Sequence, residues 1–120
     1  MRSNSSKNKV YFIKDLTTGK VKIGKSSNPT SRLKTLQIGS SSELQIKKTI
    51  PGGIYLEQII HKYFRHLRVK GEWFKPDYEM KSFLSGRRIT ISSVLDVCGK
   101  KLSKHELKYV KNLEKKRLYL

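Results

Sequence analysis

A tyrosine and a lysine near the N-terminus carry side chains that could act together on a water molecule. Tyr11 lies in the apolar run VYFIKDL at 10–16, and Lys22 lies in KVKIGK at 20–25, with TTG between the runs. Such runs predict a β-hairpin, and a loop of two or four residues would project both side chains from one face. A phenol and an amine held side by side can orient and deprotonate a water. From these residues alone, a half-buried tyrosine and a solvated lysine remain the alternative.

Three further side chains offer groups suited to phosphate chemistry. Arg32 supplies a planar, permanently charged fork of donors that matches a phosphate. Glu57 lies at the border of the apolar face of a predicted helix, and His61 follows four residues later on nearly the same side. His61 could hydrogen-bond the carboxylate, position a water or contact a phosphate, and a packing role is the equal alternative. Arg32 could equally be one of 27 basic residues on a solvated face, and Glu57 an ordinary salt-bridge partner.

The elements that must position these groups begin with the hairpin and a short helix. Asn28 can cap that helix, Pro29 suits its first position and Gly39 can end it. Residues 43–50 alternate apolar and polar side chains and predict a third strand.

Two more helices complete the predicted fold. Residues 54–67 carry apolar side chains at helical spacing and predict a helix with a strongly buried face. After a short extended piece, Pro76 is expected to start a helix whose apolar residues are Tyr78, Met80, Phe83 and Leu84. Together the elements predict an α+β fold, a small three-stranded antiparallel sheet flanked by helices.

The chain is expected to divide into three parts. Residues 1–8 form a flexible basic N-terminus, 9–86 form the compact domain, and 87–120 form a basic helical C-terminal extension. In the extension, Ser103 and Glu106 have the spacing of a capping box at the start of the last helix.

The charge balance points to a polyanionic partner. The 120 residues contain 27 Lys and Arg against 9 Asp and Glu, a formal net charge of +18. Nucleic acid is the first candidate because neutralised phosphates release counterions, and an acidic membrane surface is the competing one. One stripe of the last helix could track a phosphate backbone or simply face solvent, and it consists of Lys104, Lys108, Lys111 and Lys115.

The expected location is intracellular, either cytoplasmic or with the nucleus or nucleoid, and without membrane contact. No run approaches the ~18 apolar residues of a membrane span, and the N-terminus lacks the apolar stretch of a signal peptide. Cys98 is the single cysteine, which fits a reducing compartment.

The motifs, taken in order, resemble the GIY-YIG endonuclease superfamily, specifically the phage and meiotically-up-regulated-gene branch with KIG as the second motif. The matching motifs are VYF, KIG, SRL, LEQIIH and GEWF, which begin at residues 10, 22, 31, 56 and 71. The literal GIY at 53–55 is excluded from the catalytic strand, because it opens the helix that carries Glu57.

The resemblance implies a metal-dependent endonuclease that hydrolyses phosphodiester bonds in DNA, one strand per active site. Mg²⁺ or Mn²⁺ would be held by Glu57, with Arg32 against the scissile phosphate and either Lys22 or Tyr11 as the general base. The implied catalytic residues are Tyr11, Lys22, Arg32, Glu57 and His61. The implied supporting residues are Gly24, Glu72, Trp73 and Phe74.

Among the supporting residues, Trp73 and Phe74 are expected mainly in the core, and Glu72 can pair with a cation of the catalytic face. Lys25 and Lys34 are expected to contact nucleic acid together with the lysine stripe.

Two other functions remain open at this point. A catalytically silent nucleic-acid-binding module of the same fold would bind with a steep salt dependence and be indifferent to changes at Glu57 and Tyr11. A nuclease domain could instead obtain its specificity from a homodimer or from a partner protein. RNA is an alternative substrate to DNA.

Overall fold

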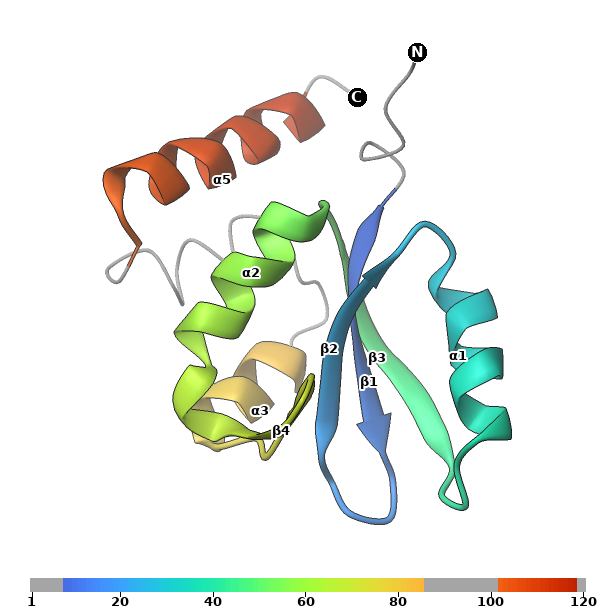
Figure 1. Cartoon of the computed structure of the whole chain (residues 1–120). Coiled ribbons are helices and arrows are strands. Elements are labelled where there is room, and N and C mark those ends of the chain that lie inside the picture. Colours follow the sequence, from blue (N-terminus) through green and yellow to red (C-terminus); the bar gives the residue numbers. More distant parts are fainter. Residues whose placement is uncertain (1–7, 86–101, 119–120) are drawn as a thin grey trace.

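A five-stranded antiparallel sheet forms the centre of the computed structural model, which describes residues 8–85 and 102–118, without the side chains of 113–118 (Figure 1). The strand order is β3-β1-β2-β5-β4. The strands are β1 (Lys9–Asp15), β2 (Val21–Ser26), β3 (Leu44–Pro51), β4 (Arg68–Lys70) and β5 (Trp73–Phe74).

The prediction of a three-stranded sheet is wrong by two short strands. β1, β2 and β3 are the predicted strands, whereas β4 and β5 form a small ribbon that extends the sheet beyond β2. These two strands have three and two residues around Gly71, whose φ is +57°. Such short strands carry no readable alternation of polar and apolar residues.

The hairpin register places the predicted tyrosine and lysine on one face. Tyr11 lies opposite Gly24 and Ile13 lies opposite Lys22 in the antiparallel β1–β2 pair. Because directly opposed residues and every second residue along a strand share a face, Tyr11 and Lys22 project from the same side of the sheet. The prediction of a shared face is confirmed.

Four α-helices are present among the described residues, and side chains cap the N-termini of three of them. In α1 (Pro29–Ile38), Asn28 Oδ1 accepts a hydrogen bond of 3.1 Å from the Ser31 N–H, and Gly39 ends the helix as expected. α2 (Ile54–Tyr63) is shorter than predicted, because the 3₁₀ turn η2 (Arg65–Leu67) replaces its last turn.

α3 (Tyr78–Ser85) starts later than predicted. Asp77 rather than Pro76 marks its beginning, because the Asp77 carboxylate accepts a 2.9 Å hydrogen bond from the Met80 N–H. Met80, Phe83 and Leu84 are buried as predicted, but Tyr78 is 85% exposed and takes no part in the core.

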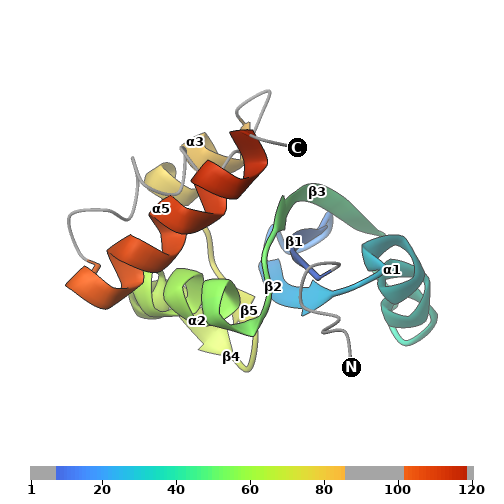
Figure 2. The ribbon, with the colours of Figure 1, turned by 90° about the horizontal axis from the view of Figure 1, so that it is seen from above.

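Helices cover both faces of the sheet. α1 lies on one face, and α2, α3 and α5 (Lys104–Leu118) lie on the other (Figure 2). The larger core cluster, on the α2 side, includes Phe12, Ile23 and Phe64. The smaller cluster, on the α1 side, contains Tyr11 and Ile13. Tyr11 and Lys22, the hairpin pair, therefore lie on the face of the sheet that has the smaller core cluster and is covered by α1.

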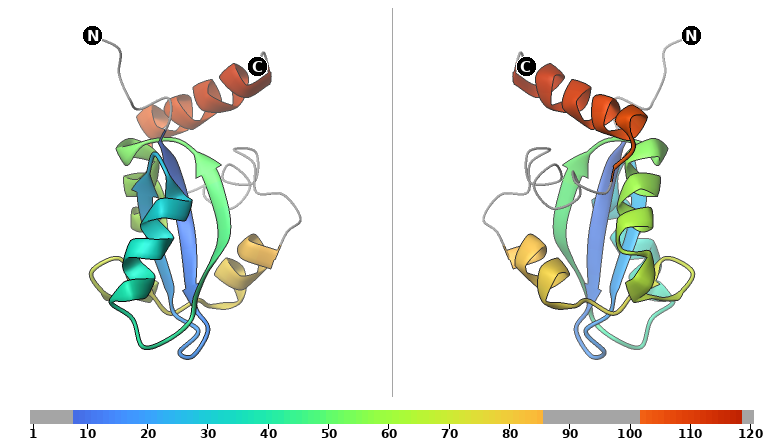
Figure 3. Two further views of the ribbon diagram at one scale, coloured as in Figure 1. Left: turned by 90° about the vertical axis from the view of Figure 1, so that its right-hand side faces the viewer. Right: turned by 90° about the vertical axis from the view of Figure 1, so that its left-hand side faces the viewer.

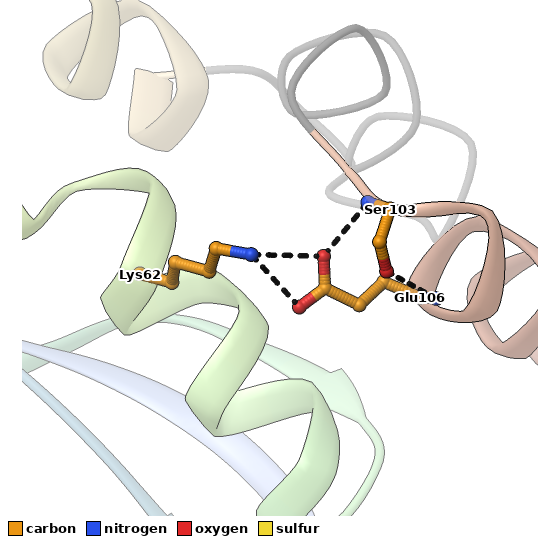
Figure 4. Close-up of polar contacts among 3 residues, drawn as sticks. All are labelled: Lys62, Ser103 and Glu106. Carbon is orange, nitrogen blue, oxygen red and sulfur yellow. Dashed lines mark hydrogen bonds and ion pairs between the residues drawn. The ribbon is translucent and has the colours of Figure 1, made fainter.

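α5 packs against the outer side of α2. Val110 is fully buried in the larger cluster, and Tyr109 meets Tyr55 edge to face with 4.5 Å between ring centroids. Glu106 Oε1 lies 3.3 Å from Lys62 Nζ and accepts a 2.9 Å hydrogen bond from the Ser103 N–H (Figure 4). The Glu106 N–H donates to Ser103 Oγ at 3.2 Å, which confirms the predicted capping box.

Two predictions are not tested by the described residues. Cys98 lies outside the described residues, and the division of the chain at residue 86 stays a prediction. Across residues 8–85 and 102–118, none of the helices has the length and apolar character needed to cross a membrane.

Candidate active site

Tyr11 is held against the bare backbone of Gly24 on the α1 side of the hairpin. The Tyr11 side chain is only 1% exposed. A Cβ on Gly24 would overlap Tyr11 Oη, would lie 2.6 Å from Tyr11 Cζ and would come within 3.1 Å of Glu72 Oε1. The missing side chain at Gly24 thus makes the space for the phenol and brings it close to Glu72.

The surroundings keep the Tyr11 hydroxyl protonated. Burial raises the pKa of Tyr11, and the hydrogen bond with Arg32 lowers it by less, so that the net pKa lies above the ordinary value. A neutral phenol can donate a hydrogen bond at physiological pH. Arg32, which is exposed on α1, therefore combines a contact to Tyr11 with a guanidinium that remains accessible to a ligand.

Lys22 is placed by Glu72 and Trp73. Its Nζ lies 3.3 Å from Glu72 Oε1 and 5.6 Å from the centroid of the Trp73 ring. Pairing of β2 with β5 sets Lys22 opposite Trp73, and the Ile23 N–H donates to the Glu72 carbonyl at 3.0 Å. Glu72 thus pairs with a cation, as expected from the sequence, and the catalytic role of that cation stays a prediction.

Glu57, His61 and Glu72 form a carboxylate–imidazole cluster. One potential metal-ligating atom from each residue lies within 4.8 Å of the others, and all three side chains are half-buried. His61 Nε2 donates a 2.7 Å hydrogen bond to the Ile23 carbonyl, and its ring packs edge to face on Phe74. Donation from Nε2 leaves the lone pair on Nδ1.

The cluster concentrates negative charge in a partly desolvated place. Burial raises the pKa of Glu57, the neighbouring Glu72 carboxylate raises it further, and His61, Lys25 and Lys22 oppose this. The net result is a pKa above the ordinary value. A cation bound between the carboxylates would relieve this repulsion, and the cluster joins carboxylate oxygens with one imidazole nitrogen, which are donors that Mn²⁺ and Mg²⁺ accept in proteins.

A cavity of about 260 Å³ lies beside two members of the cluster. Glu57 and His61 line it, together with Arg65 and Arg68. Sequence reasoning missed these two arginines, because nothing in the sequence distinguishes them among 27 basic residues. Their position depends on the 3₁₀ turn that follows α2.

The remaining residues predicted for the site either pack in or against the core or are exposed on the surface. Phe74 is fully buried in the larger core, as expected, and Trp73 is half-buried against the smaller cluster. The exposed Lys25 lies near enough to affect the pKa of Glu57, and Lys34 is exposed on α1. Lys104, Lys108 and Lys111 are exposed on α5, while the side chain of Lys115 lies outside the described part of the chain.

Comparison with known families places the chain in a different family from the one that its motifs resemble. The T5orf172 domain matches residues 8–91, which is more than half of the chain. The prediction of the GIY-YIG superfamily is therefore wrong. No curated protein and no solved structure matches the chain.

Proposed function

Because the chain belongs to the T5orf172 domain family, which indicates a nuclease-like or DNA-binding module, we propose that it is a metal-dependent endonuclease acting on DNA phosphodiester bonds. The observation that supports this most is the meeting of three pairs or clusters of side chains beside the middle of the hairpin. Tyr11 contacts Arg32, Lys22 pairs with Glu72, and Glu72 belongs to the carboxylate–imidazole cluster. Groups for water, phosphate and metal thus converge on one place.

The carboxylate–imidazole cluster is the proposed metal site. Glu57, His61 and Glu72 would hold Mg²⁺ or Mn²⁺, which when bound would polarise the phosphate and stabilise its developing negative charge. The hydrogen bond from His61 Nε2 to the Ile23 carbonyl fixes the imidazole ring and leaves Nδ1 as its available donor atom.

The hairpin pair, Tyr11 and Lys22, would orient the attacking water and assist its deprotonation. In the proposed reaction, the water oxygen forms a bond to phosphorus, and the bond from phosphorus to the leaving sugar oxygen breaks. The neutral Tyr11 hydroxyl orients the water by hydrogen bonding. The Lys22 ammonium, which lies 3.3 Å from the Glu72 carboxylate, stabilises the negative charge that develops on the water oxygen as the water proton passes to solvent. The leaving sugar oxygen takes a proton from solvent.

Arg32 would stabilise the phosphate. Arg32 is an exposed residue, and its guanidinium can donate two parallel hydrogen bonds to non-bridging oxygens, which gain negative charge in the transition state. Contact with Tyr11 keeps the guanidinium beside the attacking water.

Nicking of supercoiled plasmid tests the proposed function. The protein should convert supercoiled DNA to nicked circles in Mg²⁺ or Mn²⁺, and EDTA should stop the reaction. Intact supercoiled DNA in both metals would contradict the proposal.

The net charge of +18 also supports a second function, a catalytically silent nucleic-acid-binding module. That module would bind DNA without nicking it, and its affinity would be the same after Tyr11→Phe.

A further inference from the structure

A second and larger cavity lies on the other side of the sheet from Tyr11. Its volume is about 650 Å³, and it is bordered by the β1–β2 turn, β3, α3 and the segment before α3. Figure 3 shows α3 beside the end of the sheet at which the β1–β2 turn lies. We call it the lysine cavity, because five of its lining residues are Lys14, Lys47, Lys48, Lys75 and Lys81.

The register separates the lysine cavity from the candidate active site. Lys14 lies opposite Val21, and Lys48 lies opposite Phe12. Val21 and Phe12 belong to the larger core cluster, so both lysines project from the face opposite to Tyr11. The lysine cavity is therefore separate from Tyr11 and Lys22, and it shares no lining residue with the smaller cavity beside Glu57 and His61.

Acidic side chains are missing from the described lining of the cavity, although two lie close in sequence. The Asp15 carboxylate accepts hydrogen bonds from the Thr17 and Thr18 N–H groups at 2.8 and 3.1 Å. The Asp77 carboxylate caps α3 and lies 3.7 Å from His66 Nε2. Both carboxylates are thus held by other partners, and like charges gathered around one cavity favour an anion within it.

The other lining residues indicate which part of a nucleic acid would fit. They are small or aliphatic, with hydroxyl groups on Thr18 and Ser85, and none is aromatic. Without an aromatic ring the cavity has no platform on which a base could stack. Lysine ammonium groups and hydroxyls are typical contacts for phosphate oxygens, which carry no sequence information.

We propose that the lysine cavity binds the sugar–phosphate backbone of a nucleic acid, as a second and sequence-independent contact apart from the active site. The identity of the anion rests on the proposed function. The contact itself is tested by binding alone, without cleavage.

The test measures the salt dependence of DNA binding. Fluorescence anisotropy of a labelled duplex is followed against KCl concentration, without divalent metal and in the Glu57→Gln background, so that no strand is cut. Lys47→Gln/Lys81→Gln changes two exposed lining lysines, and Lys9→Gln/Lys70→Gln is the control with two exposed lysines outside the lining. Thermal melting of both double variants checks that the fold is intact.

The cavity variant should reduce the slope of log K against log[salt] by about 1.8, since each lost phosphate contact removes roughly 0.9. In the control variant, the slope should fall by less than half of that amount. Equal losses in the two variants would mean that only the total charge matters, and an unchanged slope in the cavity variant would likewise overturn the proposal.

A second arm separates nucleic acid from free polyphosphate. Inorganic tripolyphosphate is titrated into both variants by calorimetry. One outcome is that only the cavity variant loses tripolyphosphate binding while its salt slope for DNA is unchanged. That outcome would assign the site to a small polyphosphate and overturn the nucleic-acid contact. A reduced slope in the cavity variant, together with wild-type protein that does not nick plasmid, would support the lysine-cavity contact and contradict the proposed endonuclease. Nicking by the wild type, together with an unchanged slope in the cavity variant, would support the endonuclease and contradict the lysine-cavity contact.

Discussion

At the scale of single residues, Gly24 determines where Tyr11 can lie. Gly24→Ala would place a Cβ where the phenol now is, and the ring has little room to move because it is 1% exposed. We expect a loss of about 1–3 kcal/mol in the free energy of unfolding and a large loss of nicking. Urea denaturation measures the first effect. Gly39→Ala is the control, because its Cβ would meet only the Leu36 carbonyl at 3.9 Å, and equal stability of the two variants would contradict this account.

The Tyr11 hydroxyl itself is tested by Tyr11→Phe. The ring would keep its packing, so the melting temperature should change little, while nicking should fall about 100-fold or more because the water loses its partner. Tyr78→Phe is the matched control, since Tyr78 is 85% exposed. Nicking at the wild-type rate in Tyr11→Phe would remove the phenol from the mechanism.

The raised pKa of Glu57 predicts a pH-dependent stability. Because the folded-state pKa lies above the ordinary value, the folded protein favours the protonated carboxyl, and the associated stability is lost as the pH rises through that pKa. Glu57→Gln should therefore raise the melting temperature of the metal-free protein at pH 7 to 8, and the gain should shrink toward pH 4.

The exposed Glu43→Gln is the control for this measurement and should show no such trend. A lower melting temperature for Glu57→Gln at neutral pH would contradict the repulsion between Glu57 and Glu72.

At the scale of elements, α5 is part of the core although it lies beyond the residues that match the family. Val110 is fully buried with residues of α2 and β1, so Val110→Ala should cost about 1–3 kcal/mol of unfolding free energy. Asn112→Ala, on the exposed side of α5, should cost far less. Identical denaturation midpoints would show that α5 contributes nothing to the folded domain.

The sequence predicts the long elements well, because apolar periodicity and capping are local. Asn28 and the Ser103–Glu106 pair cap helices as their spacing indicates. For β4 and β5 the sequence predicts only a short extended piece, because strands of three and two residues are too short to show a repeated alternation of polar and apolar side chains.

The candidate site mixes local and non-local information. Glu57 and His61 share a helix face by their spacing of four residues, which the sequence predicts. Glu72 reaches them only because the Ile23 N–H bonds to its carbonyl and β5 pairs with β2. No spacing rule connects residues so far apart, so the third member of the cluster and the nearby arginines required the structure.

At the scale of the whole molecule, the positive charge is found in several separate places. Exposed lysines lie beside Glu57 at Lys25, on α1 at Lys34, along α5, and around the lysine cavity. A net charge of +18 explains strong attraction to nucleic acid, but it cannot by itself distinguish an enzyme from a binder. A test of the metal-dependent chemistry proposed for the carboxylate–imidazole cluster would distinguish them.

The most direct measurement is therefore plasmid nicking by the wild type, Glu57→Gln and Glu43→Gln in Mg²⁺ and Mn²⁺. The wild type and Glu43→Gln should nick at similar rates, and Glu57→Gln should be about 100-fold slower or worse, because it replaces a proposed metal ligand with a neutral amide. Wild-type protein that leaves the plasmid supercoiled in both metals, or Glu57→Gln that nicks as fast as the wild type, would contradict the proposed endonuclease.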